Sequence, residues 1–473
     1  MLFNSLAFCI FLPLVFAVYW YSNKSLRLQN IVLAIASYVF YGWWDYRFLV
    51  LIFVSTLVDY FVSLGMERSK NKKRRKSLLG ISVVFNLGLL GYYKYANFFI
   101  DSLVDSFQLL GLDLASPTLN VILPVGISFY TFQTLSYSID VYRGDLKANN
   151  NFLAFMVYVG FFPQLVAGPI ERSTKLLPQI LNKRTFDYQE AVLGMKQILW
   201  GLFKKMVIAD NCAPYVNEIF NSSENLHGST LLLGAILFSF QIYGDFSGYS
   251  DIAIGVSRLF GIKLTRNFHC PYFSRDIAEF WRRWHISLSS WFRDYVYIPL
   301  GGSAKNRITS IKNIFTIFLI SGFWHGANWT FIAWGAFHSL LYLPLFLLKR
   351  NRKNLSKHAG VRDGFSIVQT YLFVCIGWVF FRAKDINHAM DILTEIMSRS
   401  LFSPIQVSLR VIIVLALIIL LISLEWMTRK DDFALAKLGS KWNTTISWSF
   451  YSSLLFIIVW FAKTGTSFIY FQF

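Results

Sequence analysis

Apolar segments that could cross a bilayer recur along the whole sequence. They are clearest near the two ends, at residues 5–21, 30–41, 48–66, 366–381, 407–426 and 446–461. Of the 473 residues, 55% are hydrophobic and only 15% are charged, whereas roughly a quarter of the residues of a soluble domain are charged. Because lipid offers the backbone no hydrogen-bond partners, helices are the only way for such segments to span it without closing a barrel. The sequence therefore predicts an all-α polytopic membrane protein.

The middle of the chain is apolar but interrupted by glycine, proline and charged residues. Its segments lie near residues 78–110, 119–138, 152–169, 189–209, 229–260 and 310–348. Broken helices persist at membrane depth only where protein or a water-filled cavity satisfies the freed backbone groups. We therefore expect this region to surround a cavity, with some segments re-entrant.

The basic residues predict the orientation of the chain. The formal charge of +19 comes from residues in short loops, and the densest cluster is KNKKRRK at residues 70–76. The positive-inside rule makes this loop cytoplasmic. Three spans precede it, so the N-terminus is expected outside, and the C-terminal residues 464–473 are expected on the outer face. Nucleic-acid binding is not expected, because it needs a solvent-facing basic surface rather than scattered loops.

The chain has no internal repeat and no separate soluble domain, so residues 1–473 are predicted to form one integral-membrane unit. The first apolar segment has no basic leader or small-residue cleavage site and is interpreted as a retained span. The four cysteines are far apart, without a CxxC pair. Neither a disulfide framework nor a metal site is indicated.

Two histidines are candidates for catalysis. His325 lies in SGFWHGANWT, at residues 321–330, between apolar segments. A neutral imidazole in a dry cavity suits a general base that acts on a hydroxyl; a packed, hydrogen-bonded histidine is the alternative. His285 lies in EFWRRWHIS, at residues 279–287. The spacing of Glu279 and Arg283 is typical of a helix, so structural anchoring at the membrane interface is the stronger reading of His285 from the residues alone.

Carboxylates in apolar segments are functional candidates because a charge is costly in lipid. Asp245 and Asp251 lie in YGDFSGYSD, which we interpret as a glycine-rich interruption of an apolar segment. They could line the cavity or cap helix starts. The sequence contains no GxSxG, Walker A or HExxH motif, so soluble hydrolases, nucleotide-driven motors and zincins have no local support.

Six stretches together resemble the membrane-bound O-acyltransferase superfamily. The closest likeness is to its bacterial branch, which contains the membrane subunits for O-acetylation of alginate and peptidoglycan. The stretches are YTFQTLSY (130–137), FFPQLVAGPI (161–170), GDFSGYSD (244–251), FWRRWH (280–285), YIPLGG (297–302) and FWHG (323–326). Each alone is weak, but their order and spacing over more than half of the chain are specific.

The resemblance implies a bowl of about 11–13 membrane helices, re-entrant segments included, with a thin middle around a cavity or tunnel. A cytosolic acyl thioester, acetyl-CoA or an acyl carrier, would reach the site through it, and no further cofactor or metal is implied. The near-invariant histidine of the superfamily corresponds to His325. Its second polar position, more often Asn or His, corresponds to His285, which gives that residue a catalytic or supporting role.

The C-terminal TGTSFIYFQF, at residues 464–473, resembles the terminal motif of this envelope-acylating group. The resemblance implies that Tyr470 carries the acyl group, with His325 as base. An aromatic anchor at the membrane interface is the other reading of Tyr470. A bacterial inner-membrane location, a periplasmic partner transferase and a polysaccharide acceptor are also implied.

Two other functions remain open from the sequence. One is acylation of a lipid or a protein. The other is a transporter or flippase, suggested by the many spans, interrupted helices and intramembrane carboxylates.

Overall fold

The computed structural model describes residues 1–112, 119, 121–166, 168–303, 306–355, 358–405, 407–439, 442–463 and 468–469. Helices are the only regular elements in these ranges, which confirms the predicted all-α class. The chain forms two compact units, residues 1–194 with 256–265 and residues 195–255 with 266–473. Each is described by itself, and the prediction of one integral unit stays a prediction.

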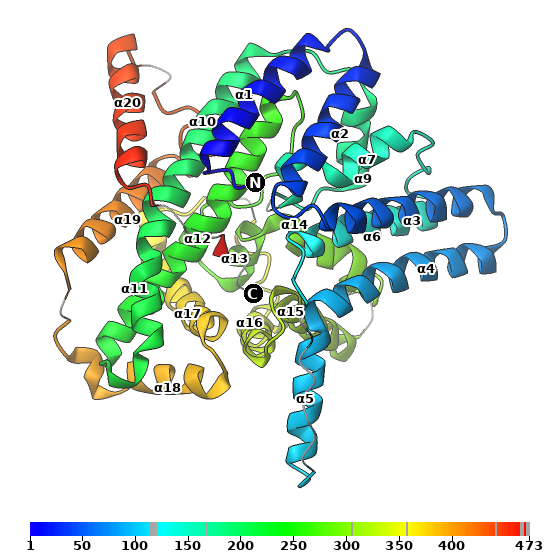
Figure 1. The fold of residues 1–473 in the computed structure, drawn as a ribbon. Coiled ribbons are helices and arrows are strands. Elements are labelled where there is room, and N and C mark those ends of the chain that lie inside the picture. Colours follow the sequence, from blue (N-terminus) through cyan, green and yellow to red (C-terminus); the bar gives the residue numbers. More distant parts are fainter. Residues whose placement is uncertain are drawn as a thin grey trace. The chain divides into compact units, whose positions relative to one another are not determined.

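The first unit holds the N-terminal helices (Figure 1). They are α1 (Leu6–Tyr21), α2 (Leu26–Gly42), α3 (Phe48–Arg68), α4 (Lys72–Leu90), α5 (Ala96–Gln108), α6 (Ile127–Arg143), α7 (Phe152–Gly160), α8 (Phe162–Leu165), α9 (Ser173–Leu181) and the first part of α10 (Tyr188–Leu202). A π-helical turn, Gly91–Tyr95, separates α4 from α5, and α5 leaves in a new direction in Figure 1. Such turns are an established cause of sharp helix kinks.

A buried polar cluster joins α3, α4 and α6, which lie side by side in Figure 1. Asp59 of α3 accepts hydrogen bonds from Ser82, from Ser138 (2.9 Å) and from Asn86 Nδ2 (2.8 Å). Thr134 donates in turn to Asn86 Oδ1 at 3.2 Å. All five side chains are buried. Hydrogen bonds between helices of this kind hold membrane bundles together where lipid provides no hydrophobic driving force.

Replacing Asp59 by leucine is expected to lower the free energy of unfolding by about 2–5 kcal/mol, because several buried donors lose their acceptor at once. Thermal unfolding of the purified protein in detergent measures the change. Asp105→Leu, at an exposed carboxylate on α5, is the control and should leave the midpoint unchanged. Equal midpoints for the two variants would contradict a structural role for the cluster.

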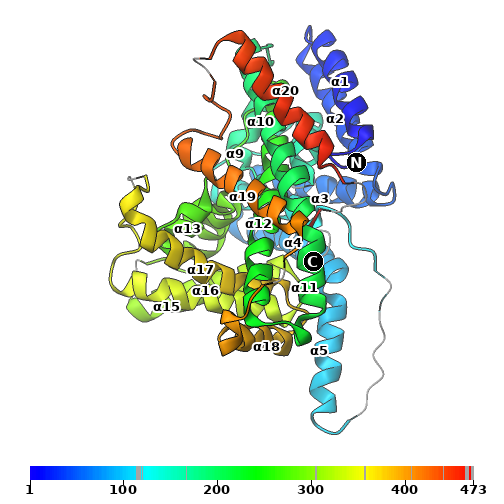
Figure 2. The ribbon, with the colours of Figure 1, turned by 90° about the vertical axis from the view of Figure 1, so that its left-hand side faces the viewer.

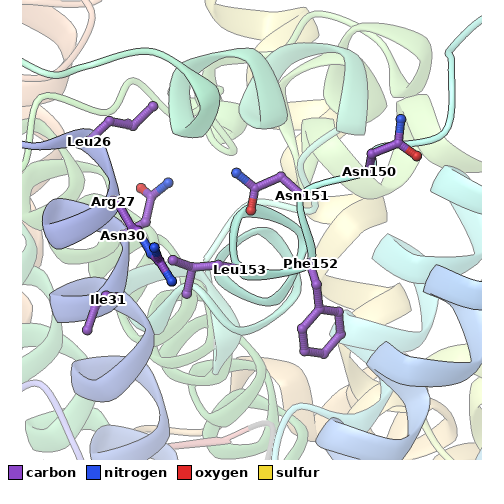
Figure 3. A pocket seen from close by; sticks show the side chains of 8 residues that line it. All are labelled: Leu26, Arg27, Asn30, Ile31, Asn150, Asn151, Phe152 and Leu153. Atoms are coloured by element: carbon purple, nitrogen blue, oxygen red, sulfur yellow. The ribbon is translucent and has the colours of Figure 1, made fainter.

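The first unit also has an open pocket of about 790 Å³ where α2 and α7 begin (Figure 3). Leu26, Arg27, Asn30 and Ile31 of α2 face residues 150–153 across it. The side chain of Asn151 caps α7 by accepting from the Ala154 N–H at 3.1 Å. Arg27 is the only ionisable residue among the eight that line the pocket. The pocket lining therefore contains no group suited to general-base catalysis.

The second unit holds the remaining helices (Figure 2). They are the end of α10, α11 (Asp210–Asn221), most of α12 (Gly228–Leu259), α13 (Ile277–Arg283), α14 (Ile286–Phe292), α15 (Arg307–His325), α16 (Trp329–Leu347), α17 (Gly364–Arg382), α18 (Ile386–Ile396), α19 (Leu409–Met427) and α20 (Thr444–Trp460). Two π-helical segments, Phe203–Ala209 and Arg293–Tyr297, follow α10 and α14.

The predicted interruption at residues 243–251 is wrong, because α12 runs through it without a break. Its glycines serve close packing instead. A Cβ atom on Gly248 would lie 2.8 Å from the carbonyl oxygen of Gly201, and one on Gly244 would lie 2.8 Å from that of Lys204. The backbones therefore approach too closely for any larger residue. It follows that Asp245 and Asp251 do not cap helix starts.

Among the described residues, six helices are long and apolar enough to cross a membrane. They are Phe48–Arg68, Lys72–Gln108, Gly228–Leu259, Trp329–Leu347, Val361–Arg382 and Leu409–Met427, with shorter apolar helices at Leu6–Tyr21, Phe152–Leu165 and Thr444–Trp460. The protein is a multi-pass membrane protein, as predicted. Which side each terminus faces stays a prediction.

Candidate active site

His325 lies at the tip of a helical hairpin in the second unit. It is the last residue of α15, and α16 begins only four residues later, after a cap in which Asn328 accepts from the Thr330 N–H at 3.0 Å. The two helices lie side by side in Figures 1 and 2. The hairpin thus fixes the residue at a defined turn rather than in a mobile loop.

Small residues explain why the hairpin closes so tightly around His325. A Cβ atom on Gly322 would collide with the Phe331 carbonyl oxygen, and one on Gly335 would collide with that of Phe318. A Cβ on Gly326 would enter the ring of Phe331. Gly322 is therefore required by backbone contact between α15 and α16, and Gly326 by the ring of Phe331 that packs against it.

Aromatic rings surround the His325 imidazole, which is 2% exposed. The ring centroids of Trp324, Trp334 and Phe381 lie 5.0, 5.2 and 5.4 Å from its own. Such a wall keeps bulk water away from the imidazole.

His285 is the second histidine of this site. Its ring centroid lies 6.4 Å from that of His325, and its side chain is fully buried. It occupies the N-cap of α14 with a φ of 43°, in the left-handed region. Non-glycine residues held in that conformation cluster at functional sites. The structure therefore brings together two histidines that stand 40 positions apart in the sequence.

Asn267 sets the tautomer of His285. Its amide Nδ2 donates to Ser250 Oγ at 3.1 Å, which leaves Oδ1 to face His285 Nδ1 at 3.1 Å. An amide oxygen only accepts, so Nδ1 of His285 carries the proton and Nε2 is the basic nitrogen. Nε2 of His285 has no hydrogen-bond partner within the described part of the chain. It is therefore an acceptor that the described residues leave unused.

The helix before His285 is anchored by charge. Glu279, 2% exposed in its side chain, pairs with Arg275 at 2.9 Å and with Arg283 at 2.7 Å. Burial raises the pKa of the Glu279 carboxyl, but the hydrogen bonds from Arg275 and the charge of Arg283 outweigh it and hold that pKa below its usual value. The predicted helical pair of Glu279 and Arg283 is confirmed. The segment that contains His285 is therefore anchored by ion pairs and also contributes to the site.

Comparison with known proteins shows which family this chain belongs to. A family model described as membrane-bound O-acyltransferase matches residues 147–383. The chain is 41% identical to the probable alginate O-acetylase AlgI of Pseudomonas aeruginosa over 392 residues, which cover 82% of this chain and 73% of the relative. The chain belongs to the membrane-bound O-acyltransferase family. It is an acyltransferase, as the sequence motifs predicted.

Two further relatives are named for different activities. The chain is 35% identical to the peptidoglycan O-acetyltransferase of Helicobacter pylori, over 83% of this chain and 79% of the relative. It is 32% identical to the teichoic acid D-alanyltransferase of Bacillus subtilis, over 58% of this chain and 72% of the relative. Its similarity thus extends to enzymes named for acylation of three different envelope or exported polymers.

Two residues of the C-terminal tail of this O-acyltransferase are described, and both are buried in the second unit. Phe468 and Ile469 are 0% and 2% exposed, and the Phe468 ring lies 4.4 Å from that of Tyr249. Tyr470, the third predicted site residue, lies outside the described residues. The predicted position of the tail on the outer face stays a prediction.

A narrow cavity of the second unit is lined by charged groups from α12 and α19. Asp251 pairs there with Lys204 at 2.5 Å, and Glu425 accepts a hydrogen bond from the Tyr243 hydroxyl at 2.7 Å. Asp251 therefore lines this small cavity, and the prediction that these carboxylates line a central cavity stays a prediction. Within the described ranges, no cluster of three or more His, Cys, Asp and Glu residues is arranged to hold a metal.

The sequence interpretation missed Asn267 and Lys205. Asn267 stands in a loop 18 residues before His285, so no local pattern points to it. Lys205, with Lys204, offered a usable signal, since two consecutive lysines inside an apolar segment must find buried partners. Lys205 binds Asp245 at 2.7 Å and Asp210 at 2.8 Å.

Asn267→Leu is expected to lower the rate of acyl transfer about 10–100-fold, the usual effect of removing a group that orients a functional histidine. Asn267→Asp keeps an acceptor for Nδ1 and should restore most of the rate. Turnover at equal membrane abundance measures both. Equal losses in the two variants would show that the residue acts through folding rather than through His285.

Proposed function

We propose that this acyltransferase takes an acyl group, of which acetyl is the favoured example, from a cytosolic thioester and passes it across a bacterial inner membrane. The acceptor is a cell-envelope or exported polysaccharide, reached through a separate periplasmic transferase. The observation that carries the proposal is the buried pair of His325 and His285, whose ring centroids lie 6.4 Å apart, in the same unit as the buried tail residues Phe468 and Ile469. The names of the relatives support a polysaccharide acceptor.

In the first step, the Tyr470 hydroxyl oxygen attacks the carbonyl carbon of the thioester while His325 takes the phenolic proton. The C–S bond breaks, and the thiolate leaves and takes the proton from His325. In water a tyrosine hydroxyl has a pKa of about 10 and is protonated at neutral pH, so attack needs a positioned base. The product is an acyl-tyrosine ester.

In the second step, the hydroxyl of an acceptor on the outer face attacks the acyl-tyrosine, and the Tyr470 oxygen leaves and regains a proton. Dividing the transfer in this way replaces one difficult reaction by two easier ones. His285 supports the chemistry because its basic Nε2 can accept a hydrogen bond from the reacting hydroxyl or from the N–H of His325.

Labelled acetyl-CoA, followed by intact mass measurement and peptide mapping of the full-length protein, tests this function. A label on the peptide that contains Tyr470, released when acceptor and periplasmic transferase are added, is the expected result. Label on a lipid or protein product instead would assign the chain to another branch of acceptors. Competent protein that transfers acetyl groups without ever carrying label would overturn the relay.

A further inference from the structure

Three charged side chains of the second unit form a buried cluster next to the tail. Lys205 Nζ lies 2.7 Å from Asp245 Oδ1 and 2.8 Å from Asp210 Oδ1. The three side chains are only 1%, 4% and 3% exposed. Buried ions are stable only when each is paired and its remaining hydrogen-bonding positions are filled. The stability of the cluster therefore depends on which groups bind its remaining carboxylate oxygens.

The tail fills one of these positions. The backbone N–H of Ile469 donates to Asp245 Oδ2 at 2.6 Å. Asp245 thus holds the lysine with one oxygen and the main chain of the tail with the other. A hydrogen bond from an amide to a buried carboxylate is among the stronger kinds in proteins.

The tail residue Phe468 is linked to His285 through aromatic side chains of α12. The Phe468 ring packs against Tyr249 at 4.4 Å and lies 6.1 Å from Phe246. Phe246 in turn makes an edge contact with His285 at 4.6 Å. Asp245 and Phe246 are neighbours on α12, so one turn of this helix contacts both the tail and the site.

We propose that Asp245, held by Lys205, is a dock for the C-terminal tail and positions the residue after Ile469 for reaction. Tyr470 is bonded to Ile469, and consecutive Cα atoms lie about 3.8 Å apart. Fixing the Ile469 amide therefore restricts where the tyrosine hydroxyl can go. The positioning role rests on the proposed function, whereas the docking of the tail does not.

The neighbouring ion pair provides a matched control. Asp251 lies six positions after Asp245 on α12 and pairs with Lys204, the residue before Lys205. Its other oxygen accepts from Gln197 Nε2 at 2.9 Å rather than from the tail. Asp245→Asn and Asp251→Asn therefore remove the same charge from the same helix, but only the first change weakens a contact with the tail.

Hydrogen exchange of the C-terminal peptide, residues 464–473, tests the dock in full-length protein in lipid nanodiscs without donor. Asp245→Asn should raise the exchange rate of the Ile469 amide at least about tenfold, the effect of about 1.4 kcal/mol, and Asp251→Asn should leave it unchanged. Ile469→Pro removes the donor while the charges stay, and should expose the tail to carboxypeptidase; Ile469→Val should not. Equal exchange in the two aspartate variants would overturn the dock.

A second readout separates the dock from the acyl relay. Asp245→Asn should lower kcat for acyl transfer more than it changes KM for acetyl-CoA, because the proposed role of the dock is to position the nucleophile rather than to bind the donor. A released tail with an unchanged kcat would preserve the dock and refute its positioning role. A protected tail in wild-type protein that never becomes acylated would refute the relay alone.

Discussion

His325→Ala should reduce acyl transfer by about 10²–10⁴-fold, the contribution of a positioned general base. In the proposed mechanism the imidazole removes the proton as the hydroxyl attacks, and no tryptophan or phenylalanine ring around it can replace it. Because the side chain is held in a wall of tryptophan and phenylalanine rings, the variant should keep its fold with a cavity in place of the ring. Acetyl release from labelled acetyl-CoA, at matched protein abundance, measures the effect.

His338→Gln is the matched control for this prediction. His338 is also fully buried in the same hairpin, with its ring centroid 4.9 Å from that of Trp334. Its change should alter thermal stability but leave turnover within a few-fold of the wild-type rate. If both histidine variants lose activity in proportion to their loss of folded protein, the proposed role of His325 as base fails.

Tyr470→Phe should abolish acylation of the tail and lower polymer acylation by about three orders of magnitude or more, as expected when a nucleophile is removed. The change deletes a single oxygen atom, so the aromatic ring can still occupy an interfacial position. An anchoring role predicts little effect, and a carrier role predicts complete loss. Mass mapping of the tail and acetate content of the polymer distinguish the two roles.

Tyr451→Phe is the control, because it removes a hydroxyl from another tyrosine of the C-terminal region, on α20. It should retain the label and the polymer acetate. Tyr470→Phe protein that still transfers acetyl groups at the wild-type rate would exclude the tyrosine from the reaction path.

The outer parts of the chain could be predicted closely from its sequence. The apolar segments at 5–21, 48–66, 366–381 and 407–426 correspond to α1, α3, α17 and α19 within a few residues at each end. These helices present large apolar side chains such as Leu14, Phe365 and Leu409 at their surface. Helices that face lipid are apolar along their length, so they can be recognised from the sequence alone.

The structure of the central region could not be predicted in this way, because it depends on contacts between residues that are distant in sequence. The sequence pattern of Gly244 and Gly248 suggests a break in the helix, but in the structure these glycines let α12 approach the backbone of Gly201 and Lys204 closely. Asn267 has no local pattern, and its role appears only when Ser250 and His285 surround it. Of the site itself, motif resemblance named His325 and His285, and the fold supplied the groups that orient them.

The charge pairs of the second unit also constrain how this protein is made. Lys204 precedes its partner Asp251 by 47 residues, so it leaves the ribosome first. Lys205 is followed closely by one partner, Asp210, and only later by the other, Asp245. Because a buried charge is costly until it is paired, Lys204 can be buried at low cost only after α12 has been made.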